Sequence, residues 1–156
     1  MNPTKTAIES PGPIIGSFRL PQLRHARVKD AMRPGVITVS PKTPLREVAR
    51  ILAAKHIHCV VVVGDDALGR PQRCGVISAL DLLAAAAGTD IAGRTAADLV
   101  AGEPCVVGGE DDLEQAAKLM AERHAEHLLV LDADDGRPVG VLSTLDVAGV
   151  LAWGEA

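Results

Sequence analysis

The sequence predicts an α+β fold made of two tandem β-α-β-β-α repeats that pack about a pseudo-twofold axis. The first observation is a heptapeptide that occurs twice, as GVISALD at 75–81 and as GVLSTLD at 140–146. The second is a constant offset, since His56 aligns with His124, 68 positions later. The third is that each copy alternates short β-branched runs with helix-like segments. One copy of about 60 residues buries too little apolar surface alone, so we expect the two copies to pair.

The first copy opens with the short strand VITV at 36–39, which the turn SPKTP closes. Thr43 can cap a helix whose first residue is Pro44. That helix runs to about Lys55, because apolar side chains recur at helical spacing. They are Leu45, Val48, Ala49 and Leu52. The remaining elements are a buried strand at 59–63, a hairpin connection at 64–73, its partner strand at 74–77 and an Ala/Leu-rich helix at 79–88.

The second copy repeats this order of elements. Its segments are CVV at 105–107, DLEQAAKLMAER at 112–123, LLVL at 128–131, DADDGR at 132–137, PVGVL at 138–142 and TLDVAGVLA at 144–152. The offset falls from 68 to 65 at the heptapeptides, so the first copy carries three extra residues, most simply within its hairpin. Insertions in such turns are well tolerated.

These patterns divide the chain into an arm, two repeats and their connections. The arm contains four prolines and no sustained periodicity, so we expect it to be flexible. The divisions are the arm at 1–27, the first repeat at 28–87, a linker at 88–94, the second repeat at 95–152 and a short end at 153–156.

Composition limits the classes of protein. Apolar residues make up 47% of the chain, but it has no Tyr, one Phe and one Trp, so its core must be aliphatic. No apolar run approaches the roughly 20 residues of a membrane span, and no secretory pattern opens the chain, so we expect a cytoplasmic protein without membrane contact. A net charge of −4 argues against nucleic acid as a partner. Three cysteines without CxxC spacing predict buried thiols rather than disulfides.

The repeated heptapeptide marks the junction between a strand and the helix that follows it. Its Ser lies beside a helix N-terminus, where free N–H groups attract anions such as phosphate. Its Asp, three residues later, lies in the first helical turn and can accept hydrogen bonds from ribose hydroxyls. A structural interpretation is also possible, because Ser can cap the helix and the negative charge of Asp can interact favourably with the helix dipole. Each of these interactions stabilises the helix by a few tenths to about 1 kcal/mol.

The two copies together resemble the cystathionine β-synthase (CBS) domain pair, also called a Bateman module. The resemblance covers 28–152 and rests on VKDAM at 28–32, on VSPKTPLREVARIL at 39–52 and on the heptapeptide at the same place in both copies. It implies that a cleft between the copies binds an adenosyl nucleotide such as AMP, ADP or ATP. The strands CVVVV and LLVL lack the Pro that many family members carry, which implies a different pocket wall.

In this family, each cleft combines the first strand and pre-strand turn of one copy with the heptapeptide of the other. The resemblance thus implies a favoured cleft formed by Thr38, His58, Ser143 and Asp146. It implies a second cleft formed by Val106, Glu126, Ser78 and Asp81. His58 matches a phosphate-contacting His of the AMP-activated protein kinase regulatory subunit, although it is equally compatible with a partly exposed turn histidine. Because Glu126 would repel phosphate, we expect unequal clefts.

The resemblance implies a stand-alone regulatory protein that is not an enzyme, requires no cofactor and signals to a protein partner. The alternative is a dimeric interaction module that binds no nucleotide. Catalysis has no support in the sequence, because no nucleophile stands outside the repeat with an activating partner in view. A structural metal site would need His56, His58, His124 and His127 to meet, and neither copy alone supplies a full set of ligands.

The closing helices, at 82–88 and 147–153, are apolar around much of their circumference. A second chain should cover them, and the family usually dimerises through such helices, so we expect a homodimer with Trp153 at or near its edge.

Positive charge gathers at the start of the chain. Residues 1–33 hold six Lys/Arg and two Asp/Glu, a net charge of +4, which leaves −8 for the rest. Basic side chains there can reach the phosphates of a ligand, bind a partner or be solvated. Those singled out are Arg19, Arg24, Arg27 and Lys29.

Overall fold

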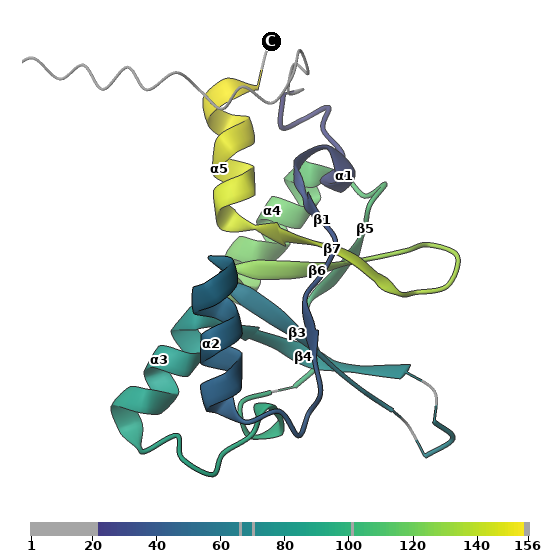
Figure 1. The fold of residues 1–156 in the computed structure, drawn as a ribbon. Coiled ribbons are helices and arrows are strands. Elements are labelled where there is room, and N and C mark those ends of the chain that lie inside the picture. Colours follow the sequence, from purple (N-terminus) through teal and green to yellow (C-terminus); the bar gives the residue numbers. More distant parts are fainter. Residues whose placement is uncertain (1–21, 66, 70, 101, 155–156) are drawn as a thin grey trace, which may run out of the picture.

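The computed structural model of the protein describes residues 22–65, 67–69, 71–100 and 102–154, in which helices cover two small β-sheets (Figure 1). The helices are α1 (Val28–Ala31), α2 (Leu45–Lys55), α3 (Ala79–Gly88), α4 (Leu113–Arg123) and α5 (Thr144–Trp153), with a 3-10 helix η1 (Ala96–Asp98). The strands are β1 (Arg33–Pro34), β2 (Thr38–Val39), β3 (Cys59–Asp65), β4 (Pro71–Ser78), β5 (Val106–Gly108), β6 (His127–Leu131) and β7 (Pro138–Ser143). Every helix in these ranges is too short or too polar to serve as a membrane span.

The expected order β-α-β-β-α holds in both repeats. The first sheet has the strand order β2-β3-β4, with β2 parallel to β3 and β3 antiparallel to β4. The second has the order β1-β7-β6-β5, with β5 parallel to β6 and β6 antiparallel to β7. The pairing register shifts after Val62 in one hairpin and after Val130 in the other, at equivalent positions. The α+β class and the tandem repeat are confirmed.

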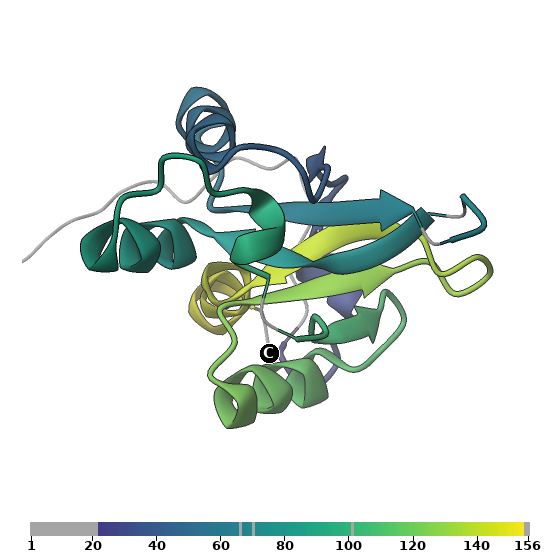
Figure 2. The same cartoon turned by 90° about the horizontal axis from the view of Figure 1, so that it is seen from below.

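The two sheets lie together in the middle of the molecule, where β4 contacts β6. Figure 2 shows α2 and α3 on one side of the pair of sheets and α4 and α5 on the other. The strands between them are therefore covered by a helix layer on one face and by the other sheet on the opposite face. Strands in this situation carry continuous apolar runs rather than an alternating pattern.

The core is aliphatic, as the composition predicts. Its centre is the pair of strands β3 and β6, each of which carries three consecutive side chains that are at most 1% exposed. These are Val60, Val61 and Val62 in β3 and Leu128, Leu129 and Val130 in β6. Full burial of one such side chain contributes about 1.5–3 kcal/mol. The apolar runs of the two repeats therefore contribute strongly to the stability of the fold.

The start of each repeat packs against the other repeat. β1 precedes the first sheet in the chain but pairs with β7, and Arg33 lies opposite Val141. Ala26 and Val28 are buried in the core of the second repeat. In return, Ala96 of η1 is buried in the core of the first repeat. The two repeats are thus interlocked, which the repeated sequence pattern did not predict.

The start of α2 differs from the prediction. Thr43 does not cap this helix, and Pro44 is its N-cap rather than its first residue, with an extended ψ of 141°. The Leu45 N–H donates to the Arg94 carbonyl at 3.0 Å, and the Ala96 N–H donates to the Thr43 carbonyl at 2.8 Å. A carbonyl group from the segment between the repeats therefore accepts a hydrogen bond from the N-terminus of α2, where the Thr43 hydroxyl was expected to do so.

The first strand is shorter than predicted. Only Thr38 and Val39 of the expected strand 36–39 form β2. The chain crosses from the second sheet to the first between Pro34 and Thr38, and it turns at Gly35, whose φ of +83° is a conformation that favours glycine. The segment 33–37, named here the crossing segment, becomes one wall of a cavity.

Part of the segment assigned to the arm is packed against the second repeat. Residues 22–27 form a turn that ends in a bridge between Arg27 and Asp112, and Ala26 within it is 1% exposed. The expectation of a flexible arm otherwise falls on 1–21, which lie outside the described residues.

Candidate functional site

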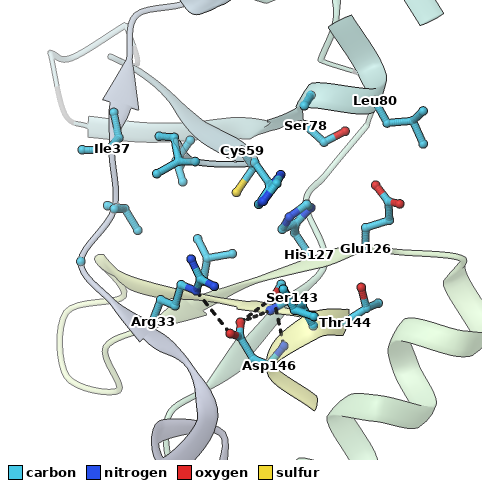
Figure 3. A pocket seen from close by; sticks show the side chains of 18 of the residues that line it. Arg33, Ile37, Cys59, Ser78, Leu80, Glu126, His127, Ser143, Thr144 and Asp146 are labelled. Carbon is cyan, nitrogen blue, oxygen red and sulfur yellow. Dashed lines mark hydrogen bonds and ion pairs between the residues drawn. The ribbon is translucent and has the colours of Figure 1, made fainter. Parts of the chain in front are cut away.

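A cavity of about 670 Å³ lies between the two repeats. Figure 3 shows side chains from the segments that line it. These are the crossing segment 33–37, the turns at 57–59 and 126–127, residue 61 of β3, the N-terminus of α3 at 78–80, and β7 and α5 at 141 and 143–146. Both repeats contribute to this cavity, and its volume falls within the range of about 300–1,000 Å³ that is typical of small-molecule sites.

A capping box forms the N-terminus of α5 at one end of the cavity. Asp146 Oδ2 accepts from the Ser143 N–H at 2.8 Å and from the Ser143 hydroxyl at 2.6 Å, while the Asp146 N–H donates to Ser143 Oγ at 3.2 Å. α3 begins in the same way, with Ser78 and Asp81 at 2.7, 2.8 and 3.1 Å. The structural interpretation of the heptapeptide is confirmed in both copies.

These bonds leave few donors for an anion at the two helix N-termini. The Thr144 N–H donates to the Glu126 carbonyl at 3.1 Å, and the Ala79 N–H donates to the His58 carbonyl at 2.8 Å. The Ser143 hydroxyl already donates to one group and accepts from another. A phosphate group in this cavity would therefore depend on charged side chains more than on the helix ends.

Arg33 supplies such a charge, although it was not among the predicted site residues. Its Nε lies 3.3 Å from Asp146 Oδ1 (Figure 3), and the two side chains are 61% and 10% exposed. The one signal in the sequence was the excess of positive charge over residues 1–33. The repeat itself gives no hint, because the position 68 residues later holds Ala.

Cys59 and His127 occupy equivalent positions in the two repeats and both line the cavity (Figure 3). Burial lowers the pKa of His127 below its ordinary value of 6.5, against an opposing effect of the Glu126 carboxylate, so the imidazole is neutral near pH 7. Burial also raises the pKa of the Cys59 thiol to about 11. Among the described lining residues, Arg33 is therefore the permanent cation, beside the carboxylates of Asp146 and Glu126.

Five of the predicted site residues line this cavity. Three were assigned to the favoured cleft and two to the second cleft. They are His58, Ser143 and Asp146 from the former and Ser78 and Glu126 from the latter. The structure thus gathers residues of both predicted clefts around a single space, because the pre-strand turns of the two repeats lie next to each other.

Three predicted residues lie outside the lining of the cavity. Thr38 is exposed, and its neighbour Ile37 lines the cavity instead, since successive residues of an extended chain face opposite sides. Val106 is 41% exposed on β5. Asp81 is exposed, and its carboxylate accepts from the Ser78 hydroxyl at 2.8 Å.

A second pocket, of about 150 Å³, is lined in part by residues equivalent to those that line the large cavity. Pro104, Cys105 and Ala125 in it stand 68 positions after three residues of the large cavity. Val100 covers Gly75 here, and a Cβ atom built at Gly75 would lie 2.5 Å from Val100 Cγ1. Its volume is below the range of about 300–1,000 Å³ that is typical of small-molecule sites. The two equivalent spaces are therefore unequal in size.

The histidines do not form a metal site within the described residues, where no three His, Cys, Asp or Glu side chains are grouped to hold an ion. His56 and His124 instead end α2 and α4 as C-caps, with φ of 51° and 50°. This left-handed conformation closes the last turn of each helix.

The fold and the cavity define a class of protein, a tandem pair of β-α-β-β-α repeats with a ligand-sized space between them. The sequence matches the CBS domain family over residues 28–88 and again over 96–152. The chain belongs to this family and contains two CBS domains in tandem.

Two solved structures illustrate the similarity. The CBS-pair protein CBSX2 from Arabidopsis thaliana, in complex with AMP, is 29% identical with a TM-score of 0.66, over 81% of this chain and 96% of that one. A CBS-domain-containing protein from Agrobacterium tumefaciens is 27% identical with a TM-score of 0.68, over 80% and 92% of the two chains.

Two curated relatives are longer than this chain. The Meiotically up-regulated gene 70 protein of Schizosaccharomyces pombe is 29% identical over 94% of this chain and 20% of its own length. An uncharacterized protein of Methanocaldococcus jannaschii is 24% identical over 89% of this chain and 43% of its own length. The chain thus spans less than half the length of the curated relatives it matches.

Proposed function

We propose that this chain is a regulatory CBS pair that binds an adenosyl nucleotide in the large cavity and signals to a protein partner. The observation that carries the proposal is the cavity itself, about 670 Å³ in volume, with Asp146 and Arg33 at one end and aliphatic side chains along the crossing segment. The AMP complex of the similar protein CBSX2 supports the choice of ligand.

Each part of such a ligand has a matching wall in the cavity. The aliphatic side chains of Val36, Ile37 and Ile57 offer apolar surface to a purine base. Asp146 Oδ1 is turned toward Arg33 rather than into the capping box, and it can accept a hydrogen bond from a ribose hydroxyl. The His58 imidazole or the Arg33 guanidinium can donate to a phosphate.

Regulation would follow from the position of the cavity between the repeats. A ligand there touches the crossing segment, both pre-strand turns and the starts of α3 and α5 at once. Binding therefore favours the arrangement of the repeats in which all these groups fit the ligand. The size of the shift is set by the difference between the affinity of the ligand for this arrangement and its affinity for the other arrangements. We infer that the chain acts by binding rather than by catalysis, since both heptapeptide serines are engaged as helix caps.

We also propose a homodimer formed through α3 and α5. Five large apolar side chains of these helices are between 56% and 66% exposed: Leu80, Leu83, Leu145, Leu151 and Trp153. Such a surface is typical of an interface between protein chains. Leu80 and Leu145 also line the cavity, so the state of the cavity can influence the dimer surface.

Calorimetric titration with AMP, ADP, ATP, NAD and S-adenosylmethionine tests the binding proposal. We expect saturable binding of at least one of them. The absence of binding of all five by a chain with an intact circular dichroism spectrum would leave the dimeric interaction module as the better interpretation.

Light scattering at micromolar concentration tests the dimer. We expect a dimer for the parent protein and a monomer for Leu83→Glu or Leu151→Glu, because a carboxylate in an apolar interface is costly. Leu68→Glu is the matched control, since Leu68 is 75% exposed in the hairpin between β3 and β4. A monomeric parent protein would contradict the proposal.

A further inference from the structure

The two oxygens of the Asp146 carboxylate have different roles. Oδ2 is occupied by the capping box, where it accepts from both the N–H and the hydroxyl of Ser143. Oδ1 is the oxygen that remains for a ligand, and it is the one that Arg33 Nε approaches at 3.3 Å. A ligand hydroxyl that binds Asp146 must therefore share Oδ1 with Arg33 or displace it.

Arg33 can move away from Asp146 without a large change in the fold. Its backbone is held in β1 opposite Val141, but its side chain is 61% exposed and points across the cavity (Figure 3). An ion pair with one exposed partner is worth at most about 1 kcal/mol. The planar guanidinium also has two terminal NH₂ groups that can donate to phosphate oxygens when Nε is engaged.

The other charges of the cavity make this cation important for an anionic ligand. Asp146 and Glu126 both line the cavity and repel phosphate, and the half-buried His127 is neutral near pH 7. The Ser143 hydroxyl is already engaged. Without Arg33, a phosphate group would meet carboxylates and His58 but no permanent positive charge among the described lining residues.

We propose that Arg33 is the residue that makes this cavity select a phosphorylated over an unphosphorylated nucleoside, by exchanging its ion pair with Asp146 for one with the ligand phosphate. The proposal rests on the proposed nucleotide function and names the side chain that makes the cavity prefer an anionic ligand. For Asp81, the equivalent of Asp146, the position that corresponds to Arg33 is 101, and it holds Ala, which carries no charge. The exchange is therefore specific to one half of the pair.

The test compares the affinities of AMP and adenosine in the parent protein and in Arg33→Gln, by calorimetry. In the variant we expect AMP to bind at least about fivefold more weakly, because a partly exposed ion pair with the phosphate is lost. We expect adenosine to bind as well as before or more tightly, because Oδ1 of Asp146 is released. The matched control is Arg50→Gln, which removes the Arg50–Glu47 ion pair on α2, where Arg50 is 69% exposed and lies outside the lining of the cavity. Arg33→Lys should retain part of the preference for AMP.

The outcomes separate this inference from the proposed function. If the parent protein binds neither AMP nor adenosine, the inference about Arg33 is refuted, and the proposed function fails as well if ADP, ATP, NAD and S-adenosylmethionine also do not bind. If it binds both and the ratio of their dissociation constants is the same in Arg33→Gln, the proposed function stands and the role of Arg33 is refuted. If Arg33→Gln weakens both ligands equally, Arg33 has only a structural role, and that result also overturns the inference. Unfolding curves of all three variants confirm that each is folded before titration.

Discussion

Asp146 and Asp81 form a matched pair: both belong to helix capping boxes, and we propose that Asp146 also binds the ligand. Each carboxylate accepts from the backbone N–H and the hydroxyl of the Ser three residues earlier, at distances that agree within 0.2 Å. Asp146 lines the cavity, whereas Asp81 does not. Replacement of each by Ala therefore separates the effect on the fold from the effect on binding.

Loss of the capping box should cost each variant about 1 kcal/mol of unfolding free energy. Asp146→Ala also loses the ion pair with Arg33, which adds less than about 1 kcal/mol because Arg33 is exposed. Binding should respond differently. A hydrogen bond from a ligand hydroxyl to a charged carboxylate is worth about 1.5–3 kcal/mol, so Asp146→Ala should weaken AMP binding by about tenfold or more.

Urea unfolding gives the first quantity and calorimetric titration with AMP gives the second. We expect similar unfolding free energies for the two variants and a large difference in affinity, with Asp81→Ala close to the parent protein. Equal loss of affinity in both variants would mean that the two halves are coupled or that the ribose does not bind Asp146. Unchanged affinity in a folded Asp146→Ala would refute the assignment outright.

Three further predictions concern the core and the walls of the cavity. Burial lowers the pKa of His127 below 6.5, so the unfolded chain binds the proton more readily than the folded chain. The unfolding free energy should therefore be highest above pH 6.5 and fall as the pH drops below it. In urea unfolding measured at several pH values, His127→Gln should weaken this pH dependence. With its pKa near 11, Cys59 should be only about 0.1% thiolate at pH 8. It should therefore react slowly with thiol reagents, which can be measured in a variant in which Cys74 and Cys105 are replaced by Ser. Rapid labelling of this folded variant would contradict the raised pKa. Gly140→Ala should destabilise the fold by about 1–3 kcal/mol, because the new Cβ would lie 2.7 Å from the backbone oxygen of Arg33 on β1. A stability equal to that of the parent protein would contradict this prediction.

Much of the fold could be predicted because each repeat carries local signals that its own short segments satisfy. The heptapeptide marks a strand, a cap and a helix within seven residues, and the capping boxes at Ser78 and Ser143 are what such a pattern predicts. The aliphatic run at 59–63 predicted a buried strand for the same reason. Local chemistry and the final fold agree at these places.

The errors lie where the decisive partner is distant in sequence. Thr43 was expected to cap α2, but the Arg94 carbonyl accepts from the first N–H group of that helix. Arg33 was overlooked because its partner, Asp146, lies in the other repeat and because the equivalent position in the second copy is Ala. Thr38 was placed in the lining and lies outside it, since a shift of one residue along an extended chain reverses the face that a side chain occupies.

The pairing of β1 with β7 has a consequence for how the chain reaches its native state. Arg33 lies opposite Val141, so the two strands that meet are 108 residues apart in the order of synthesis. During translation β1 is synthesised before both hairpins, and it can pair with β7 only after β7 has been made. Closure over so long a loop carries an entropic penalty that grows with loop length, and folds rich in such distant contacts form slowly. The wall that carries Arg33 should therefore be among the last parts of the molecule to assemble, and the cavity should be complete only when the whole pair has folded.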